Sequence, residues 1–302
     1  MELQQLRYVL AVGDTRSFTR AAKQCFVVQS SLSHQVKALE SELGVRLFAR
    51  TSRRVELTEA GAAFLPAARS ALDSAERAAQ DAAAAAGEVH GHLALGTIPT
   101  LTAVDLPRVL GRFCHEHPHV SVSSRTASSD DLVAAVRAGE IDVAFLGLPD
   151  TAAPRGGRYV RLADERLVAV LHRDHRLTGR RRIHLHDLSE ESFADFPAGT
   201  AGRAQNDAAF TAAGLLRRVA FEAMDTALVL DLIGNGLATA LLPAGVVPER
   251  DDLATVPLGD GPQRAEYLMW SDFNPTAAAT AFLAVLSVQT GLSVQTGLSV
   301  QN

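Results

Sequence analysis

Apolar residues recur at helical spacing three times within the first 44 residues of the chain. The three apolar faces consist of Leu3, Leu6, Val9 and Leu10; of Phe18, Ala21 and Ala22; and of Leu32, Val36, Leu39 and Leu43. Spacings of three and four residues predict amphipathic helices. Ser17 is a suitable N-cap for the second helix, and Gly44 is a suitable C-terminal stop for the third.

The third of these helices carries small polar and basic side chains on its other face. They are Ser30, Ser33, His34, Lys37 and Ser41. A short helix, a tight turn over 25–28 and a longer helix with a polar face are typical of a helix-turn-helix. In a major groove, Ser and Gln side chains can bond base edges and His34 can donate or accept, whereas Lys37 is expected to meet phosphate.

After Gly44 the pattern changes from helical to extended. Two short extended segments, 47–50 and 55–57, flank a polar tip and predict a β-hairpin wing. Three guanidinium groups gather there, those of Arg50, Arg53 and Arg54. These like charges repel one another unless an anion binds between them, which favours contact with phosphate or with the minor groove. A solvated hairpin tip is the alternative, but the preceding helix-turn-helix favours DNA.

Residues 58–86 form an alanine-rich segment with a near-heptad apolar seam. The seam positions are Phe64, Ala68, Leu72, Ala75, Ala79 and Ala82. Thr58 can cap this helix, and the small seam residues allow close approach of a partner helix. We therefore expect a dimerising linker helix; a solvated spacer helix is the alternative.

From residue 92 onward, strand-like and helix-like segments alternate. The strand candidates are "HLALGTI", "VSVSSRTA", "IDVAFLGL", "RLVAVLHR", "RVAFEAM", "LATALLP" and "YLMWSDF", and the helical ones are 106–115, 130–138, 204–213 and 226–235. This alternation predicts an α/β architecture with largely parallel sheets.

Ligands of open α/β sheets bind where strands end and helices begin, and free N–H groups there suit anions. The candidate effector-binding residues are Thr97, Thr100, Thr102, Ser128, Ser129, Thr200, Arg203 and Thr226. Helix capping is the alternative role for the hydroxyl side chains, and a surface salt bridge is the alternative for Arg203.

The charge of the chain is unevenly distributed. The 302 residues carry a net charge of −5 with 47% hydrophobic residues, as in an ordinary globular protein. Residues 1–58 contain nine Lys and Arg residues and five Asp and Glu residues, so this segment carries a net charge of +4 and the remainder a net charge of −9. A basic head can attract phosphates, although chance alone can also produce such an imbalance. The absence of an apolar run or a signal-like N-terminus leads us to expect a cytoplasmic protein without membrane contact.

Other chemistries find little support in the sequence. The histidines of "FCHEHPH" do not have zinc-site spacing, and Cys25 and Cys114 form no close pair. There is also no P-loop, strand-borne GxGxxG or nucleophile–base pair. We therefore expect no metal, no cofactor and no enzymatic activity.

Residues 6–61 resemble the LysR-type transcriptional regulators. The order "SFTRAA", Gln29, "LSHQVKALESELGVRLFAR" and "LTEAG" carries the resemblance. It implies a winged helix-turn-helix DNA-binding domain over 1–58, a dimerising linker helix over 59–88 and an effector domain over 89–302. That last domain would resemble periplasmic binding proteins, with subdomain I at about 89–160 and 263–302 and subdomain II at about 161–262.

The resemblance also implies roles, partners and assembly. Gln29, Ser30, Ser31, Ser33, His34 and Lys37 match the recognition helix, and Arg50, Arg53 and Arg54 match the wing. The implied partners are double-stranded DNA, a small-molecule effector and further copies of the chain, as a homodimer or homotetramer. Leu146 stands where some members that sense aromatic acids carry Arg, so a benzoate-like effector is not expected. The alternatives are a protein of solute-binding fold that does not regulate genes and a regulator whose body only oligomerises and senses no ligand.

One position departs from the family pattern. Val28 stands where a hydroxyl residue usually precedes the glutamine, and valine cannot accept a hydrogen bond from the first turn of a helix. The missing cap costs about 1 kcal/mol unless it is replaced. Either Ser30 starts the helix instead, or Gln29 bends back to cap it.

Overall fold

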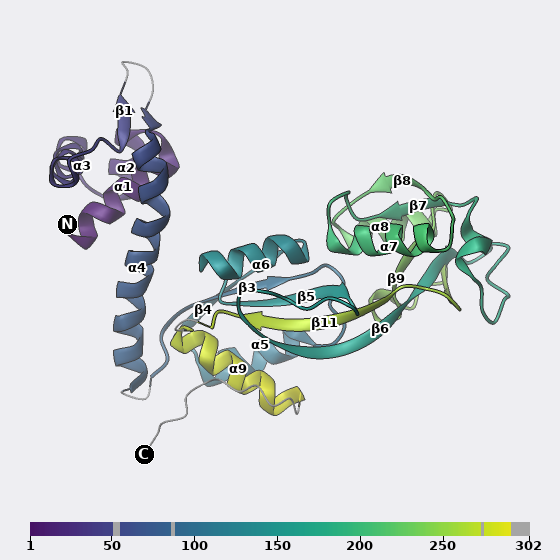
Figure 1. The fold of residues 1–302 in the computed structure, drawn as a ribbon. Coiled ribbons are helices and arrows are strands. Elements are labelled where there is room, and N and C mark those ends of the chain that lie inside the picture. The colour runs from purple at the N-terminus through teal and green to yellow at the C-terminus, as the bar shows by residue number, and fades with distance from the viewer. Residues whose placement is uncertain (51–54, 86–87, 273–274, 291–302) are drawn as a thin grey trace. The chain divides into compact units, whose positions relative to one another are not determined.

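The computed structural model describes residues 1–50, 55–85, 88–272 and 275–290, which fold into two compact units. The first unit is Met1–Ala86 and the second is Gly87–Asn302 (Figure 1). The linker helix thus belongs to the first unit. Among the described residues, no helix is both long and apolar enough to cross a bilayer.

The first unit consists of a helical head with a hairpin and a long helix. Its elements are α1 (Leu3–Thr15), α2 (Phe18–Gln24), α3 (Gln29–Leu43), β1 (Phe48–Arg50), β2 (Val55–Leu57) and α4 (Glu59–Ala85). The three predicted helices and the hairpin are confirmed. Leu32, Val36 and Leu39 are fully buried in the core that includes α1, but Leu43, the last residue of α3, is 36% exposed.

Helix α4 begins at the predicted cap and continues through Pro66. The Oγ1 atom of Thr58 accepts a hydrogen bond from the Gly61 amide at 3.0 Å and donates to the Arg46 carbonyl at 2.6 Å. Ala68 and Leu72 are buried in the core of their own unit, at 2% and 8% exposure. This part of the predicted seam therefore packs within the chain, since α1 covers it, and the side chains of Ala79 and Ala82 lie outside the described set.

The second unit contains a seven-stranded sheet in which β9 pairs with β6 beside the order β10-β6-β11-β5-β3-β4. These strands are β3 (Gly91–Thr97), β4 (Val120–Thr126), β5 (Val143–Pro149), β6 (Arg158–His172), β9 (Ala240–Pro243), β10 (Leu253–Pro257) and β11 (Gln263–Trp270). Only the β3–β4 and β3–β5 pairs in this sheet are parallel. The sheet is therefore mixed, and the expectation of largely parallel pairing is wrong for it. The chain leaves one half of the unit on β6 and returns on β11, so these two strands run in opposite directions.

Helices cover both faces of the sheet. Helices α5 (Leu106–Glu116) and α9 (Ala277–Thr290) pack on one face through Phe113 and Phe282, whereas α6 (Ser129–Ala138) covers the other face through Leu132 (Figure 1). Beyond the long strands lie the parallel pair β7 (Ser192–Asp195) and β8 (Arg218–Glu222), the helices α7 (Ala201–Ala212) and α8 (Thr226–Gly234), and the 3₁₀ turns Leu185–Leu188 and Ala244–Val246. These elements have apolar clusters of their own.

Candidate functional site

Helix α3 presents the predicted polar face to solvent. Gln29, Ser30, Ser31, His34 and Lys37 are exposed, and Ser33 is half-buried. The helix begins at Gln29, directly after Val28, and no side-chain hydrogen bond caps it. Neither Ser30 nor Gln29 replaces the missing cap, so the first turn of α3 keeps free N–H groups beside the exposed polar residues.

The wing is described only at its base. Strands β1 and β2 pair antiparallel from Phe48 opposite Leu57 to Arg50 opposite Val55. The backbone of Arg50 therefore ends β1, while its side chain and all of Arg53 and Arg54 lie outside the described residues. The predicted role of these three guanidinium groups stays a prediction.

A cleft in the second unit brings together four of the predicted effector residues. Thr100 follows β3, Ser128 and Ser129 begin α6, and Thr200 begins α7. The cleft encloses about 530 Å³, which includes its open mouth. Apolar residues form much of the remaining wall, among them Ile98, Phe196, Met224, Leu241 and Leu242. A largely apolar cleft with a few placed polar groups is typical of a small-molecule site.

The hydroxyl groups of this cleft also hold the fold together. Ser128 accepts a hydrogen bond from the Asp131 amide at 3.2 Å, and Thr200 accepts one from the Arg203 amide at 3.4 Å, so both cap helices. Ser129 donates to the Gly147 carbonyl at 2.9 Å and accepts from the Gly147 amide at 3.0 Å. Capping and lining the cleft are therefore compatible roles for these side chains.

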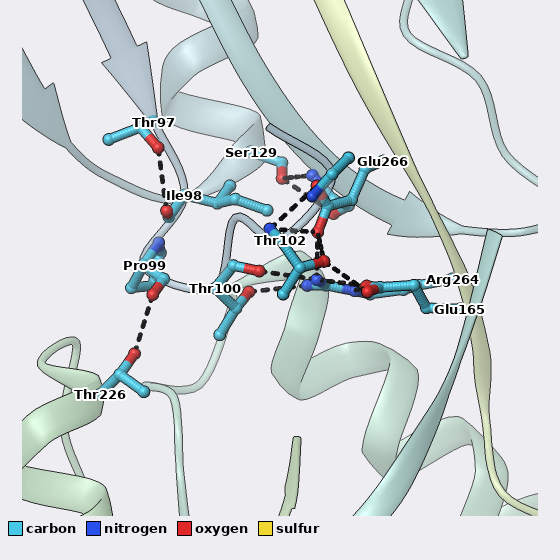
Figure 2. A network of polar contacts seen from close by, with 12 residues as sticks. Thr97, Ile98, Pro99, Thr100, Thr102, Ser129, Glu165, Thr226, Arg264 and Glu266 are labelled. Atoms are coloured by element: carbon cyan, nitrogen blue, oxygen red, sulfur yellow. Dashed lines mark hydrogen bonds and ion pairs between the residues drawn. The ribbon is translucent and has the colours of Figure 1, made fainter. Parts of the chain in front are cut away.

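Arg264 on β11 lines the same cleft, and sequence reasoning did not find it. Its Nη1 donates to the Thr100 hydroxyl at 2.7 Å and its Nη2 to the Thr100 carbonyl at 2.7 Å (Figure 2). Its Nε and Nη2 also donate to Oε2 of Glu165, at 2.9 and 2.7 Å. Only 6% of Arg264 is exposed. A buried cation needs such partners. In the sequence, the only indication of this buried ion pair was the group of polar residues in "QRAE".

A second carboxylate completes the network around Arg264. Glu266 is fully buried and accepts from Nη2 of Arg264 at 2.5 Å, from the Thr102 hydroxyl at 2.8 Å and from the Ala103 amide at 2.9 Å (Figure 2). Burial raises the pKa of Glu266 above its ordinary value, and the adjacent Arg264 opposes that rise. Thr102 also contacts Glu165. It thus joins two carboxylates and does not line the cleft.

The structure does not bring the other predicted effector residues to the cleft wall. Thr97 donates to the Ile98 carbonyl at 3.1 Å, and Thr226 donates to the Pro99 carbonyl at 3.1 Å (Figure 2). Arg203 is paired with Asp207 at 2.9 Å and with Glu222 at 2.7 Å, which is the salt-bridge alternative. Leu146 is buried in the core, and its neighbour Gly147 lines the cleft, because successive strand residues face opposite sides.

The arrangement can therefore bind a small molecule but offers it no unsatisfied cation among the described lining residues. The guanidinium of Arg264 is already balanced by Glu165 and Glu266. The starts of α6 and α7 supply backbone N–H groups and the positive ends of two helix dipoles. A ligand with a single anionic or strongly accepting group matches this chemistry better than a multiply charged one.

Comparison with known proteins covers both units. The family model "Bacterial regulatory helix-turn-helix protein, lysR family" matches residues 3–62, and "LysR substrate binding domain" matches residues 86–289. The HTH-type transcriptional regulator ShiR of Corynebacterium glutamicum (strain R) is 34% identical over 248 residues, 81% of this chain and 83% of that protein. The hydrogen peroxide-inducible genes activator of Dickeya chrysanthemi is 31% identical over 264 residues, 85% of each chain.

A solved structure extends the similarity to the whole fold. Full-length CbnR complexed with its target DNA matches with a TM-score of 0.71 and 29% identity, over 95% of this chain and 99% of that one. The predicted winged helix-turn-helix and α/β effector domain are thereby confirmed as the family arrangement. The chain belongs to the LysR family of bacterial helix-turn-helix transcriptional regulators.

Proposed function

We propose that this regulator binds double-stranded DNA through the polar face of α3 and changes that binding when a small organic molecule occupies the cleft of the second unit. The observation that carries the proposal is the division of α3 into two faces. Leu32, Val36 and Leu39 are fully buried, while Gln29, His34 and Lys37 are exposed. No catalytic step is part of this function, and chromosomal DNA as the target places its action in the cytoplasm.

The polar face of α3 supports a division of labour between base and phosphate contacts. Gln29, Ser30, Ser31, Ser33 and His34 carry groups that pair with base edges, whereas Lys37 carries a charge suited to phosphate. Arg50, Arg53 and Arg54 of the wing add phosphate or minor-groove contacts. The excess of Lys and Arg in residues 1–58 supports this assignment.

The cleft supports an effector of limited charge. Thr100, Ser128, Ser129 and Thr200 supply hydroxyl groups, and the starts of α6 and α7 favour one anionic or accepting group. Because Arg264 already contacts two carboxylates, a second or third negative charge on the ligand would find no cation there. We therefore propose an apolar organic molecule with one carbonyl group or one acid group, other than an aromatic acid of the benzoate kind, because Leu146 stands where an arginine would be expected for such an acid.

Sensing of peroxide by a cleft thiol is not favoured, although some relatives are named as hydrogen peroxide-inducible activators. The chain has two cysteines. Cys25 belongs to the first unit, and Cys114 is an exposed residue of α5; neither lines the cleft.

We further propose a homodimer through α4 and, from it, a homotetramer. Ala68 and Leu72 are buried by α1, so the partner helix would contact the part of the seam from Ala75 onward. The small side chains there allow two helices to approach closely.

The test measures DNA binding and ligand response on the full chain. Duplexes selected from a random library should bind with an affinity that falls steeply with salt. A metabolite that raises the melting temperature should also alter DNA binding, and Gly202→Leu, which places a large side chain at the cleft wall, should abolish the ligand response alone. The proposal fails if no duplex is selected. The non-sensing alternative is favoured if no metabolite changes the melting temperature or DNA binding, and a ligand response that Gly202→Leu leaves unchanged counts against the cleft as the binding site.

A further inference from the structure

Two exposed apolar side chains stand at the start of the recognition helix. Phe26 is 95% exposed and Val28 is 69% exposed. The residues that alternate with them, Cys25 and Val27, pack against the core of the head. The turn between α2 and α3 therefore presents Phe26 and Val28 to solvent while its other side is buried.

Phe26 has a backbone conformation that does not suit a phenylalanine. Its φ angle is +55°, in the left-handed region. The Val27 amide donates to the Ala22 carbonyl at 3.0 Å and the Phe26 amide to the Lys23 carbonyl at 3.2 Å, a pattern that closes the end of α2. The left-handed residue of this motif is usually Gly or Asn. A large aromatic residue is unfavourable there, and its ring gains almost no burial in return.

Val28 is equally unsuited to its own position. It is the N-cap of α3, with φ −74° and ψ 142°, and it makes no side-chain hydrogen bond. Ser, Thr, Asp or Asn at this position would bond a first-turn amide and stabilise the helix. As with Phe26, an exposed apolar side chain replaces the residue that the local geometry favours.

Two departures of the same kind, two residues apart, indicate a functional constraint at this point. In helix-turn-helix proteins the start of the second helix reaches the base edges in the major groove. The apolar group on those edges is the C5 methyl of thymine. Lys23, which is exposed and lies two residues before this turn, matches a polyanion better than an apolar protein surface.

We infer that Phe26 and Val28 form an apolar contact with a thymine methyl group and thereby set a preference for thymine in the operator half-site. The inference rests on the proposed DNA-binding function. To the polar residues of α3 it adds two specificity residues whose side chains cannot form hydrogen bonds and which precede the helix in the sequence.

The experiment replaces thymine by uracil, which removes only the methyl group. Duplexes are selected with the full-length protein, and the winning site is resynthesised with deoxyuridine at each thymine in turn. For the wild type, one substitution per half-site should weaken binding about threefold to tenfold. The remaining substitutions should have little effect.

Two variants separate this contact from a folding effect. Phe26→Asn and Val28→Ser should each raise the unfolding midpoint of the head, because each suits the local backbone, and each should reduce the distinction between thymine and uracil. Val28→Thr, which keeps a branched methyl group, should retain part of that distinction. Val45→Ser is the matched control, since Val45 is 48% exposed beyond the other end of α3, and it should change neither property.

The outcomes distinguish this inference from the function on which it rests. Failure to select any duplex would count against DNA binding itself. A selected duplex that binds equally well with thymine and uracil at every position overturns the thymine contact and leaves DNA binding intact. Variants that keep the full thymine preference also overturn it.

Discussion

Arg264 holds Thr100 at two points, at the hydroxyl through Nη1 and at the carbonyl through Nη2, each at 2.7 Å. The two residues are 164 positions apart in the sequence. The loop after β3 is thus attached to the central strand β11. Since Thr100 lines the cleft, the position of this loop depends on a cation that is itself balanced by two glutamates.

Arg264→Lys should lower the free energy of unfolding of the second unit by about 2 kcal/mol. Lysine keeps the charge but cannot reproduce the forked hydrogen bonds to Thr100 and Glu165. Urea unfolding of the full chain, analysed for the transition that belongs to the second unit, measures this loss of free energy. The variant should also weaken the response to any cleft ligand.

Arg112→Lys is the control for that change. Arg112 pairs with Glu116 at 2.7 Å on the surface of α5, where both side chains are substantially exposed. Such a pair contributes less than about 1 kcal/mol, so this variant should unfold like the wild type. Equal losses in the two variants would show that the buried network has no special role.

Glu266→Gln should change how stability depends on pH. Burial raises the pKa of Glu266 above its ordinary value, so the folded state binds this proton more tightly than the unfolded state. The stabilisation is complete below the unfolded pKa and is lost as pH rises through the folded pKa. From about pH 4.5 upward, the wild type should therefore lose stability relative to the variant. Urea midpoints measured across this range check the sign, and parallel curves contradict it.

Lys37→Ala and His34→Ala should affect DNA binding in different ways. Loss of the Lys37 ammonium should weaken binding to all sequences and reduce the salt slope by about 0.9, the value for one phosphate contact. Loss of the His34 imidazole should leave the slope unchanged and alter the preferred base pairs. Fluorescence anisotropy at several salt concentrations, with selected and scrambled duplexes, separates the two. Identical behaviour of both variants would refute the assigned roles.

Ala75→Glu should disrupt the proposed dimer. Ala75 is half-buried and lies just beyond Leu72 on the seam of α4. A carboxylate between two closely packed helices would be desolvated without a partner. Light scattering should show a smaller species for this variant, whereas Ser74→Glu, at the exposed neighbouring position, should leave the mass unchanged.

The head could be predicted from the sequence because its contacts are local and its periodicity is strong. Leu32, Val36 and Leu39 alone define the buried face of α3, and Gly44 takes the left-handed conformation expected at its end. The missing hydroxyl at Val28 was recognised from the sequence, but neither replacement considered for it, Ser30 or Gln29, caps the helix. The exposure and the strained backbone of Phe26 were not predicted, because a phenylalanine beside Cys25 and Val27 looks like a core residue.

The second unit was harder to predict, since its decisive contacts span much of the chain. The first half of β6, residues 158–165, mixes polar and apolar residues without a two-residue period, so only its apolar second half was expected as a strand. β7 has four residues, too few for a clear pattern. Glu165, Arg264 and Glu266 resemble solvent-facing strand residues, and their mutual burial follows from the pairing of β6 with β11.

The pairing of β6 with β11 also determines how the second unit unfolds. Gln263–Trp270 lies along residues 158–166, and the far part of β6 then pairs with β9 and β10. Both apolar halves of the unit therefore depend on the same backbone ladder. Slow hydrogen exchange should extend along β6 on both sides of the irregularity at Leu162, and the two halves should lose amide protection together, in one cooperative step.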